Sequence, residues 1–379
     1  MSNNLMTAHQ QWASRPEDQR FQTLEELSRA VSARRMRSRA SDVKMTDAAF
    51  DVTDSGDIEL VGVTRATQLS HWSFGQTARY LGAPAEYLRG RIKDNPELVK
   101  RNLNYLVTTV ESTGSNPQAK LMVVDGEGDE SPTLQALTSP TYGRIWDADV
   151  ADCTKRIVEQ SDGKFYNPKA YASGGRGNAL GGAVENSGLY ASDRDIFIFM
   201  IDGGSVLDAG PRAQLNRGFF MWNSEVGSAT FGLTTFLFNM VCGNHIIWGA
   251  QDVNEFTVRH TKNGPYRFDS QAYPMLKAYV ESSAERDISV IRKAQSSLIP
   301  CLTAKPDFDS VKNYAHRGGN KFTKAELEGG IHAALLEEGD CRTVWQLTQG
   351  LTAHARTYEW VDARVDLERR AGKILNMLN

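Results

Sequence analysis

The chain has 379 residues, with 43 Lys and Arg against 46 Asp and Glu, which gives a net charge of −3 at pH 7. Hydrophobic residues make up 40% and charged residues 23%, a composition that excludes a disordered or collagen-like chain. A chain of this length can bury a core without disulfide or metal support. The near-zero net charge creates no overall field that attracts nucleic acid or acidic membranes, so such a partner must be held by a local patch.

The cysteine pattern and the N-terminal sequence predict a cytoplasmic protein. The four cysteines stand far apart, without the spacing of a metal site or a redox motif. Residues 1–20 contain no apolar run of the kind that a secretory signal needs. Residues 226–247 carry no charge, yet Asn239, Asn244 and His245 are costly in hydrocarbon. We therefore expect this segment to lie in a buried core, with no membrane as a partner.

The N-terminal third predicts a basic arm and a helical subdomain. Residues 1–45 are polar and basic, with LEEL at 24–27 followed by six Lys and Arg residues, and they predict a short helix that gives way to a mobile arm. Such an arm fits both a solvated tail and a contact to phosphates. Residues 51–63 predict a hairpin, and helical spacing of apolar residues predicts helices between 71 and 110. We expect an N-terminal helical subdomain over 46–118.

Residues 119–268 predict an α+β core. Runs that indicate strands lie at 121–125, 133–137, 142–146, 164–172, 195–202, 215–222, 246–249 and 255–260. Helical spacing predicts a helix over 147–160, and an apolar run predicts a buried helix over 231–241. Residues 269–379 show helical periodicity. The predicted fold class is α+β: a central mixed or antiparallel sheet with inserted helices, an N-terminal helical subdomain and a long helical C-terminal region.

Catalytic and metal signatures are missing from the sequence. There is no GxxxxGK[ST], HExxH or GxSxG motif, and the histidines show no ligand spacing. The glycine-rich segment 173–188 lacks GxGxxG, so a flexible connector and a backbone clamp on phosphates, helped by Arg176, both remain open. Asp193, Asp195 and Asp202 fit strand-end caps better than metal or acid–base chemistry. We predict no catalytic residue, no metal and no cofactor; whether the protein is an enzyme stays open, although these absences weigh against it.

The most informative segment is RGFFMWNSEVGSATFGLTTFLFNMVCGNHIIWG, residues 217–249. Asn223 and Ser224 are typical helix N-caps and Glu225 suits a first helical turn, so NSEVG predicts the start of the buried helix. The functional alternative places Trp222, Asn223 and Glu225 at a groove.

Basic and aromatic residues interleave around this segment and suggest a surface for nucleic acid. Such a groove follows phosphates with Lys and Arg and stacks bases on aromatic rings. The candidate nucleic-acid-binding residues are Lys164, Lys169, Tyr171, Arg176, Arg212, Arg217, Trp222 and Asn223. In this interpretation the Lys and Arg residues neutralise phosphates, while Tyr171 and Trp222 stack bases. The alternative is that the aromatic residues form the core of the strands.

Several stretches carry a family resemblance. They are HWSFGQTARYLGAPAEYLR, NLNYL, SPTYGRIWDADV, LYASDRDIFIFMID, the 217–249 segment and ARVDLERRAGKIL. From about residue 65 to the C-terminus they resemble phage- and plasmid-like proteins of domain-of-unknown-function family nine-three-two. NSEVG followed by VCGN is the most specific part, and His245 stands where glycine is expected. The resemblance implies a phage or plasmid in a bacterial cell and no established reaction, so no catalytic residue is carried over.

The leading hypothesis is a phage- or plasmid-encoded protein that binds single-stranded nucleic acid, DNA in the first place, and anneals DNA in recombination or replication. The predicted architecture is loosely similar to single-strand annealing proteins of the Red-beta/RecT kind. We expect a homo-oligomer in the bacterial cytoplasm. The alternatives are an enzyme with a site near NSEVG and a protein-interaction factor that acts on a host protein. The near-neutral charge favours the alternatives, whereas the missing motifs disfavour the enzyme.

Overall fold

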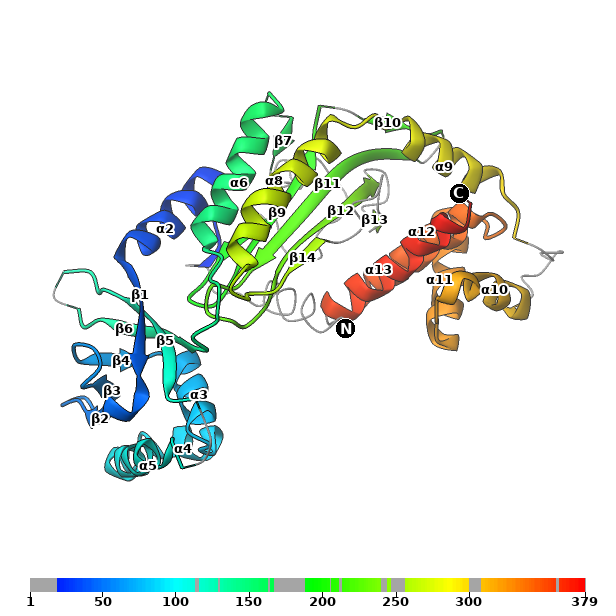
Figure 1. The fold of residues 1–379 in the computed structure, drawn as a ribbon. Coiled ribbons are helices and arrows are strands. Elements are labelled where there is room, and N and C mark those ends of the chain that lie inside the picture. The colour runs from blue at the N-terminus through cyan, green and yellow to red at the C-terminus, as the bar shows by residue number, and fades with distance from the viewer. Residues whose placement is uncertain are drawn as a thin grey trace.

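The protein combines two β-sheets with a C-terminal group of helices (Figure 1). The computed structural model describes residues 19–112, 116–128, 130–162, 164–166, 188–204, 206–210, 213–239, 244–246, 256–299, 308–358 and 361–378. We call the first sheet with its helices, residues 38–138, the N-terminal lobe, and the second sheet with its helices the central lobe. The predicted α+β class is confirmed, with two sheets in place of one.

The N-terminal lobe is a six-stranded sheet packed against three helices. The strand order is β1–β5–β6–β4–β3–β2, and every pair is antiparallel except β4 with β6. The elements are β1 (Ser38–Lys44), β2 (Ala49–Val52), β3 (Ile58–Val61), β4 (Thr67–Leu69), α3 (His71–Tyr80), α4 (Ala85–Arg91), α5 (Pro96–Thr109), β5 (Gln118–Val124) and β6 (Thr133–Thr138). Ser70 caps α3 and Asn95 caps α5. The apolar faces of these helices share one core with the sheet, which includes Phe74, Leu103 and Leu121.

The central lobe is an eight-stranded antiparallel sheet with helices on one face (Figure 1). The strands follow the order β13–β12–β11–β9–β7, while β10 pairs with β11, β14 with β12 and β8 with β9. The elements are α2 (Leu24–Arg37), α6 (Asp147–Gln160), β7 (Phe165–Tyr166), β8 (Leu189–Ala191), β9 (Ile196–Asp202), β10 (Leu207–Asp208), β11 (Gln214–Asn223), β12 (Phe231–Asn239), β13 (Asn244–Ile246), β14 (Phe256–Val258) and α8 (Gly264–Glu281). Side chains alternate along the strands: Ile198 and Met200 pack with the helices, whereas Phe197, Phe199 and Phe220 stack on one another.

The C-terminal region is helical, as predicted. Its helices are α9 (Glu285–Ser296), α10 (Phe308–Ala315), α11 (Lys324–Glu337), α12 (Val344–Ala355) and α13 (Val361–Leu375). Thr323 and Thr343 begin α11 and α12 with capping boxes. The two helices lie so close together that a Cβ on Gly350 would stand 2.2 Å from the main-chain oxygen of Gly330, and glycine at position 350 permits this approach. Across the described ranges, no helix has the length and apolar character that a membrane crossing requires.

Three local predictions are wrong. Residues 231–239 form strand β12 instead of a buried helix, and NSEVG forms the turn between β11 and β12 instead of a helix start. Residues 142–146 form an irregular connection before α6 and not a strand. A strand that is buried on both faces has no alternation, so its apolar run does not distinguish it from a buried helix.

The predicted domain boundaries also differ from the structure. Residues 24–44 form α2 and β1, so this part of the predicted 1–45 arm is packed on the sheets, while residues 1–18 lie outside the described ranges. The predicted helical subdomain, 46–118, contributes three strands besides its helices, and its end falls inside β5. In this lobe β1 pairs with β5, and β4 pairs with β6, although each pair is far apart in the sequence. No local signal in the sequence therefore predicts the boundaries of the lobe.

Candidate functional site

Two of the predicted nucleic-acid-binding residues lie in the core. Trp222 is 1% exposed and packs against Phe220 and the main chain at Gly232. Asn223 is fully buried, and its Nδ2 donates to Asp147 Oδ1 at 2.8 Å. Both residues belong to a central strand whose faces are covered, which leaves neither side chain open to a base. The structure therefore does not place Trp222 or Asn223 on a nucleic-acid surface.

Arg217 is also buried and already has partners. Its Nη1 and Nη2 donate to the main-chain oxygen and the Oγ of Ser282, at 2.8 and 2.7 Å. Its guanidinium lies 4.1 Å from the ring centre of Tyr279, and its Nε is 3.6 Å from Asp287 Oδ2. A guanidinium held in this way is not free to neutralise a phosphate, so the predicted role of Arg217 is not supported.

The other candidate residues are divided between the surface and the undescribed ranges. Lys164 is exposed just before β7 and remains available to an anion. Lys169, Tyr171, Arg176 and Arg212 lie outside the described residues, as does most of the glycine-rich segment. Their assignment to nucleic acid stays a prediction.

The aspartates around β9 serve the strand ends. Asp193 is exposed, whereas Asp195 is 1% exposed and accepts a hydrogen bond from Ser192 Oγ at 2.7 Å. Asp202 Oδ1 accepts the N–H of Gly204 at 2.8 Å. These are capping contacts of the kind that aspartates make in turns. In the described part of the chain, no three His, Cys, Asp or Glu side chains gather closely enough to hold a metal ion.

A cluster of buried charges surrounds the NSEVG turn. Arg34 Nη2 from α2 lies 2.7 Å from Asp147 Oδ2 and 3.2 Å from Glu225 Oε1. Glu225 Oε2 accepts the N–H of Asp147 at 3.1 Å. Burial raises the pKa of Asp147, and the neighbouring Glu225 carboxylate raises it further. One guanidinium thus joins α2, the start of α6 and the turn.

This carboxylate pair is enclosed by the protein. Asp147 is fully buried and Glu225 is 3% exposed. Arg144 covers the turn: it donates to the main-chain oxygen of Glu225 and lies near the rings of Tyr142 and Trp146. A carboxyl group with a raised pKa, such as that of Asp147, is typical of active sites, but such groups also occur in structural networks. Because neither carboxylate lines the pockets described below, the arrangement favours a structural role.

The NSEVG turn connects the two lobes. The main-chain oxygen of Val226 accepts hydrogen bonds from Trp72 Nε1 at 3.2 Å and from Gln76 Nε2 at 2.8 Å. Gln76 Oε1 accepts the N–H of Leu137 in β6 at 3.0 Å. The amide of Gln76 therefore joins α3, β6 and the turn, and it stands where two pockets meet.

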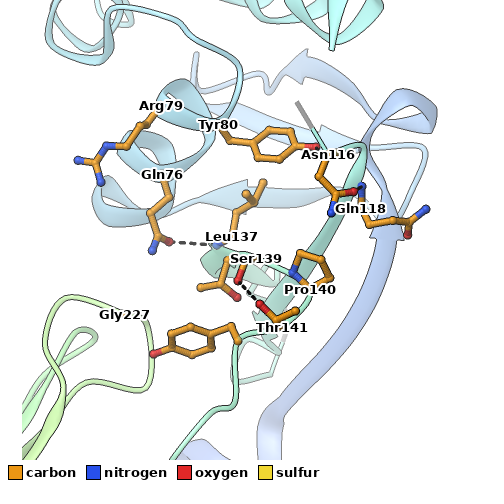
Figure 2. A pocket seen from close by; sticks show the side chains of 12 residues that line it. Gln76, Arg79, Tyr80, Asn116, Gln118, Leu137, Ser139, Pro140, Thr141 and Gly227 are labelled. Atoms are coloured by element: carbon orange, nitrogen blue, oxygen red, sulfur yellow. Dashed lines mark hydrogen bonds between the residues drawn. The ribbon is translucent and has the colours of Figure 1, made fainter. Parts of the chain in front are cut away.

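The first pocket has a volume of about 550 Å³ and opens between α3, the start of β5 and the loop after β6 (Figure 2). Figure 2 shows Gln76 and Tyr80 on one side, with Asn116 and Gln118 across from Tyr80. Tyr142 also lines it, and its ring stacks on the imidazole of His260 with 5.0 Å between ring centres. Its lining thus joins aromatic rings to amides, which can both donate and accept hydrogen bonds.

The second pocket, of about 390 Å³, lies between α3 and α4. It shares Gln76 and Arg79 with the first pocket, so the two are neighbours along α3. Its ionisable lining residues are His71, Arg79, Glu86, Arg89 and Arg194. We call the two pockets together the α3 groove.

Sequence reasoning did not identify the α3 groove. His71, Gly75 and Arg79 recur every four residues, which indicates one face of a helix but not what that face adjoins. Arg194 reaches the same pocket from more than a hundred residues further along the chain. This contact depends on the packing of the two lobes, and no local motif signals it.

Comparisons with known proteins found nothing similar. No protein-family model matches the chain, and searches of curated proteins and of solved structures also found no match. The resemblance to the phage- and plasmid-like family stays a prediction.

Proposed function

We propose that this protein binds single-stranded nucleic acid in the α3 groove. The observation that carries the proposal is the adjacency of two pockets, one lined by aromatic rings and amides and the other by guanidinium groups. Proteins that bind single strands stack bases on aromatic side chains and hold the phosphates with Arg and Lys. Gln76 and Arg79 belong to both pockets, so one nucleotide can reach both. The site differs from the one predicted around Arg217 and Trp222.

The first pocket suits a base. Asn116 and Gln118 are exposed, and their amides offer the donors and acceptors that base edges require. Tyr80 is held by a hydrogen bond from its hydroxyl to the main-chain oxygen of Asn116. Pockets of several hundred Å³ with a few polar groups are typical of small-ligand sites. The ligand that we infer is single-stranded DNA, and the activity is annealing by a homo-oligomer in recombination or replication.

Fluorescence anisotropy of a labelled single-stranded DNA tests the proposal. We expect binding that weakens steeply between about 50 and 200 mM salt, because bound phosphates release counterions. Arg79→Gln should weaken binding and lower the salt slope by about one. Arg79 is exposed and makes no ion pair within the described ranges, so its loss should leave the fold intact. Arg101→Gln is the matched control, because Arg101 is exposed on α5 and does not line the groove.

Absence of binding at the lower salt concentration would contradict the proposal. Equal losses in the Arg79 and Arg101 variants would place the binding site elsewhere. A host protein that co-purifies with a chain unable to bind DNA would favour a protein-interaction factor.

A further inference from the structure

The pocket between α3 and α4 has a strongly basic lining. His71 and Arg79 reach it from α3, Arg89 from α4, and Arg194 from the turn before β9. Glu86, which is exposed, is the one carboxylate among the described residues that line it. Three guanidinium groups and an imidazole around one small volume form a site for an anion with several oxygens.

Arg89 is held in place by α3. Its Nη2 donates to the main-chain oxygen of His71 at 3.2 Å, and its guanidinium lies 5.7 Å from the ring centre of Phe74. Gly75 permits this approach, because a Cβ there would stand 3.0 Å from Nη2. The Nε of Arg89 is buried and has no hydrogen-bond partner among the described residues. The contacts to α3 therefore fix the guanidinium of Arg89, while its Nε–H has no acceptor among the described residues.

Arg194 has a fixed main chain and a weakly engaged side chain. Its N–H donates to Ser192 Oγ at 3.0 Å, and its main-chain oxygen accepts from Ser224 Oγ at 2.6 Å. Its side chain is 33% exposed, and its Nε stands 3.9 Å from Asp193 Oδ1. An exposed ion pair at that distance contributes little free energy. The guanidinium can therefore turn to a ligand in the pocket.

The electrostatics of His71 are consistent with an anion site. Burial lowers the pKa of His71, and the positive charges of Arg89 and Arg194 lower it further, while Asp193 acts in the opposite direction. The pocket thus has a positive potential that disfavours another cation. An anion bound there would reverse this effect on the imidazole.

We propose that the pocket between α3 and α4 binds a phosphate group through Arg89 and Arg194. Arg79, shared with the neighbouring pocket, lies between this phosphate and the base. The inference rests on the proposed function, in which the phosphate belongs to the bound DNA strand. Because Arg89 belongs to the N-terminal lobe and Arg194 to the central lobe, the phosphate bridges the lobes.

Histidine NMR with inorganic phosphate as the probe tests the pocket without nucleic acid. The His71 resonance is assigned by its loss in His71→Gln, and its pKa is measured with and without phosphate at constant ionic strength. We expect the pKa of His71 to rise by about one unit and to level off at saturating phosphate. The bound anion attracts the protonated imidazole and offsets its repulsion by the guanidinium groups of Arg89 and Arg194. Arg194→Gln and the Arg89→Gln/Arg194→Gln double variant should reduce or abolish the rise, and Arg91→Gln should keep it.

Arg91 is a suitable control because it lies on α4 beside Arg89 but contacts Tyr87 and Asp94 outside the pocket. If phosphate leaves the His71 pKa unchanged, or if the rise persists in the folded double variant, the proposal is wrong. Arg194→Gln should fold normally, because among the described residues the guanidinium of Arg194 forms an ion pair only with Asp193, at 3.9 Å.

Single-stranded DNA separates this inference from the proposed function. If the phosphate pocket holds a phosphate of the bound strand, the Arg194 variant binds DNA more weakly and with a salt slope smaller by about one. If phosphate raises the His71 pKa but DNA does not bind, the phosphate pocket is supported and the proposed function fails. If DNA binds equally well with and without Arg194, and phosphate has no effect, the groove function survives and the phosphate pocket is overturned.

Discussion

At the scale of single residues, the molecule holds several of its arginines inside the fold. Arg217 is predicted from its setting among aromatic residues to meet phosphates, but it pairs with Asp287 and Ser282 from the C-terminal half. Asp287 is fully buried, and neither of its carboxylate oxygens has a hydrogen-bond partner among the described residues. Burial raises its pKa from 3.8 to about 6, although Arg217 opposes the rise.

This raised pKa predicts a pH dependence of stability. The folded protein keeps the Asp287 proton up to higher pH than the unfolded chain, so the stability present below about pH 4 is lost as the pH rises through about 6. The difference between the two pKa values corresponds to about 3 kcal/mol. Urea unfolding at a series of pH values checks this. Between about pH 4 and pH 6 the free energy of unfolding of the wild type should fall by this amount relative to that of Asp287→Asn. Parallel pH profiles for the two proteins would contradict the prediction.

At the scale of elements, the pair β11 and β12 explains why the 231–241 prediction fails. Their register places Trp222 opposite Gly232, and the indole occupies the space above that glycine. A Cβ on Gly232 would stand 1.8 Å from Trp222 Cζ2. A glycine in an apolar run looks in the sequence like a weak point of a helix or strand, but here it gives room to a cross-strand neighbour.

Gly232→Ala should therefore destabilise the protein by about 3 kcal/mol, since a buried indole cannot move without disturbing the core. The free energy of unfolding from urea titration checks this value. Gly90→Ala is the control: it lies on α4 with open space around its Cβ position, and a better helix former there should leave stability equal or slightly higher. Similar stabilities for the two variants would show that the strand pair tolerates the added methyl group.

At the scale of the whole molecule, the NSEVG turn and Gln76 connect the lobes. The same amide that bonds Val226 and Leu137 also lines both pockets of the α3 groove. Gln76 therefore belongs both to the proposed binding groove and to the contact between the lobes, to which Trp72 also contributes a hydrogen bond. This arrangement exists because two segments about ninety residues apart meet on α3.

Gln76→Ala should loosen this connection. The N–H of Leu137 loses its partner, and we expect a cost of about 1 kcal/mol at this site. Hydrogen exchange at the Leu137 amide should then be about five times faster, while amides of β9 and β11 keep wild-type rates. Gln118→Ala is the control: Gln118 lines the same pocket but forms no hydrogen bond to the turn, so its loss should leave hydrogen exchange at the Leu137 amide unchanged. An unchanged rate in Gln76→Ala would show that the bond does not protect β6.

Local spacing in the sequence was enough to predict the α+β class, the hairpin of β2 and β3, helix α6 and the helical C-terminal region. Capping residues, periodicity and turn residues act over a few positions, so they are legible in the chain. Long-range packing, by contrast, makes NSEVG a turn, buries Arg217 and Trp222 and brings Arg194 beside α3. These outcomes depend on pairing and packing between distant segments, which compete with local preference and outweigh it in a buried sheet.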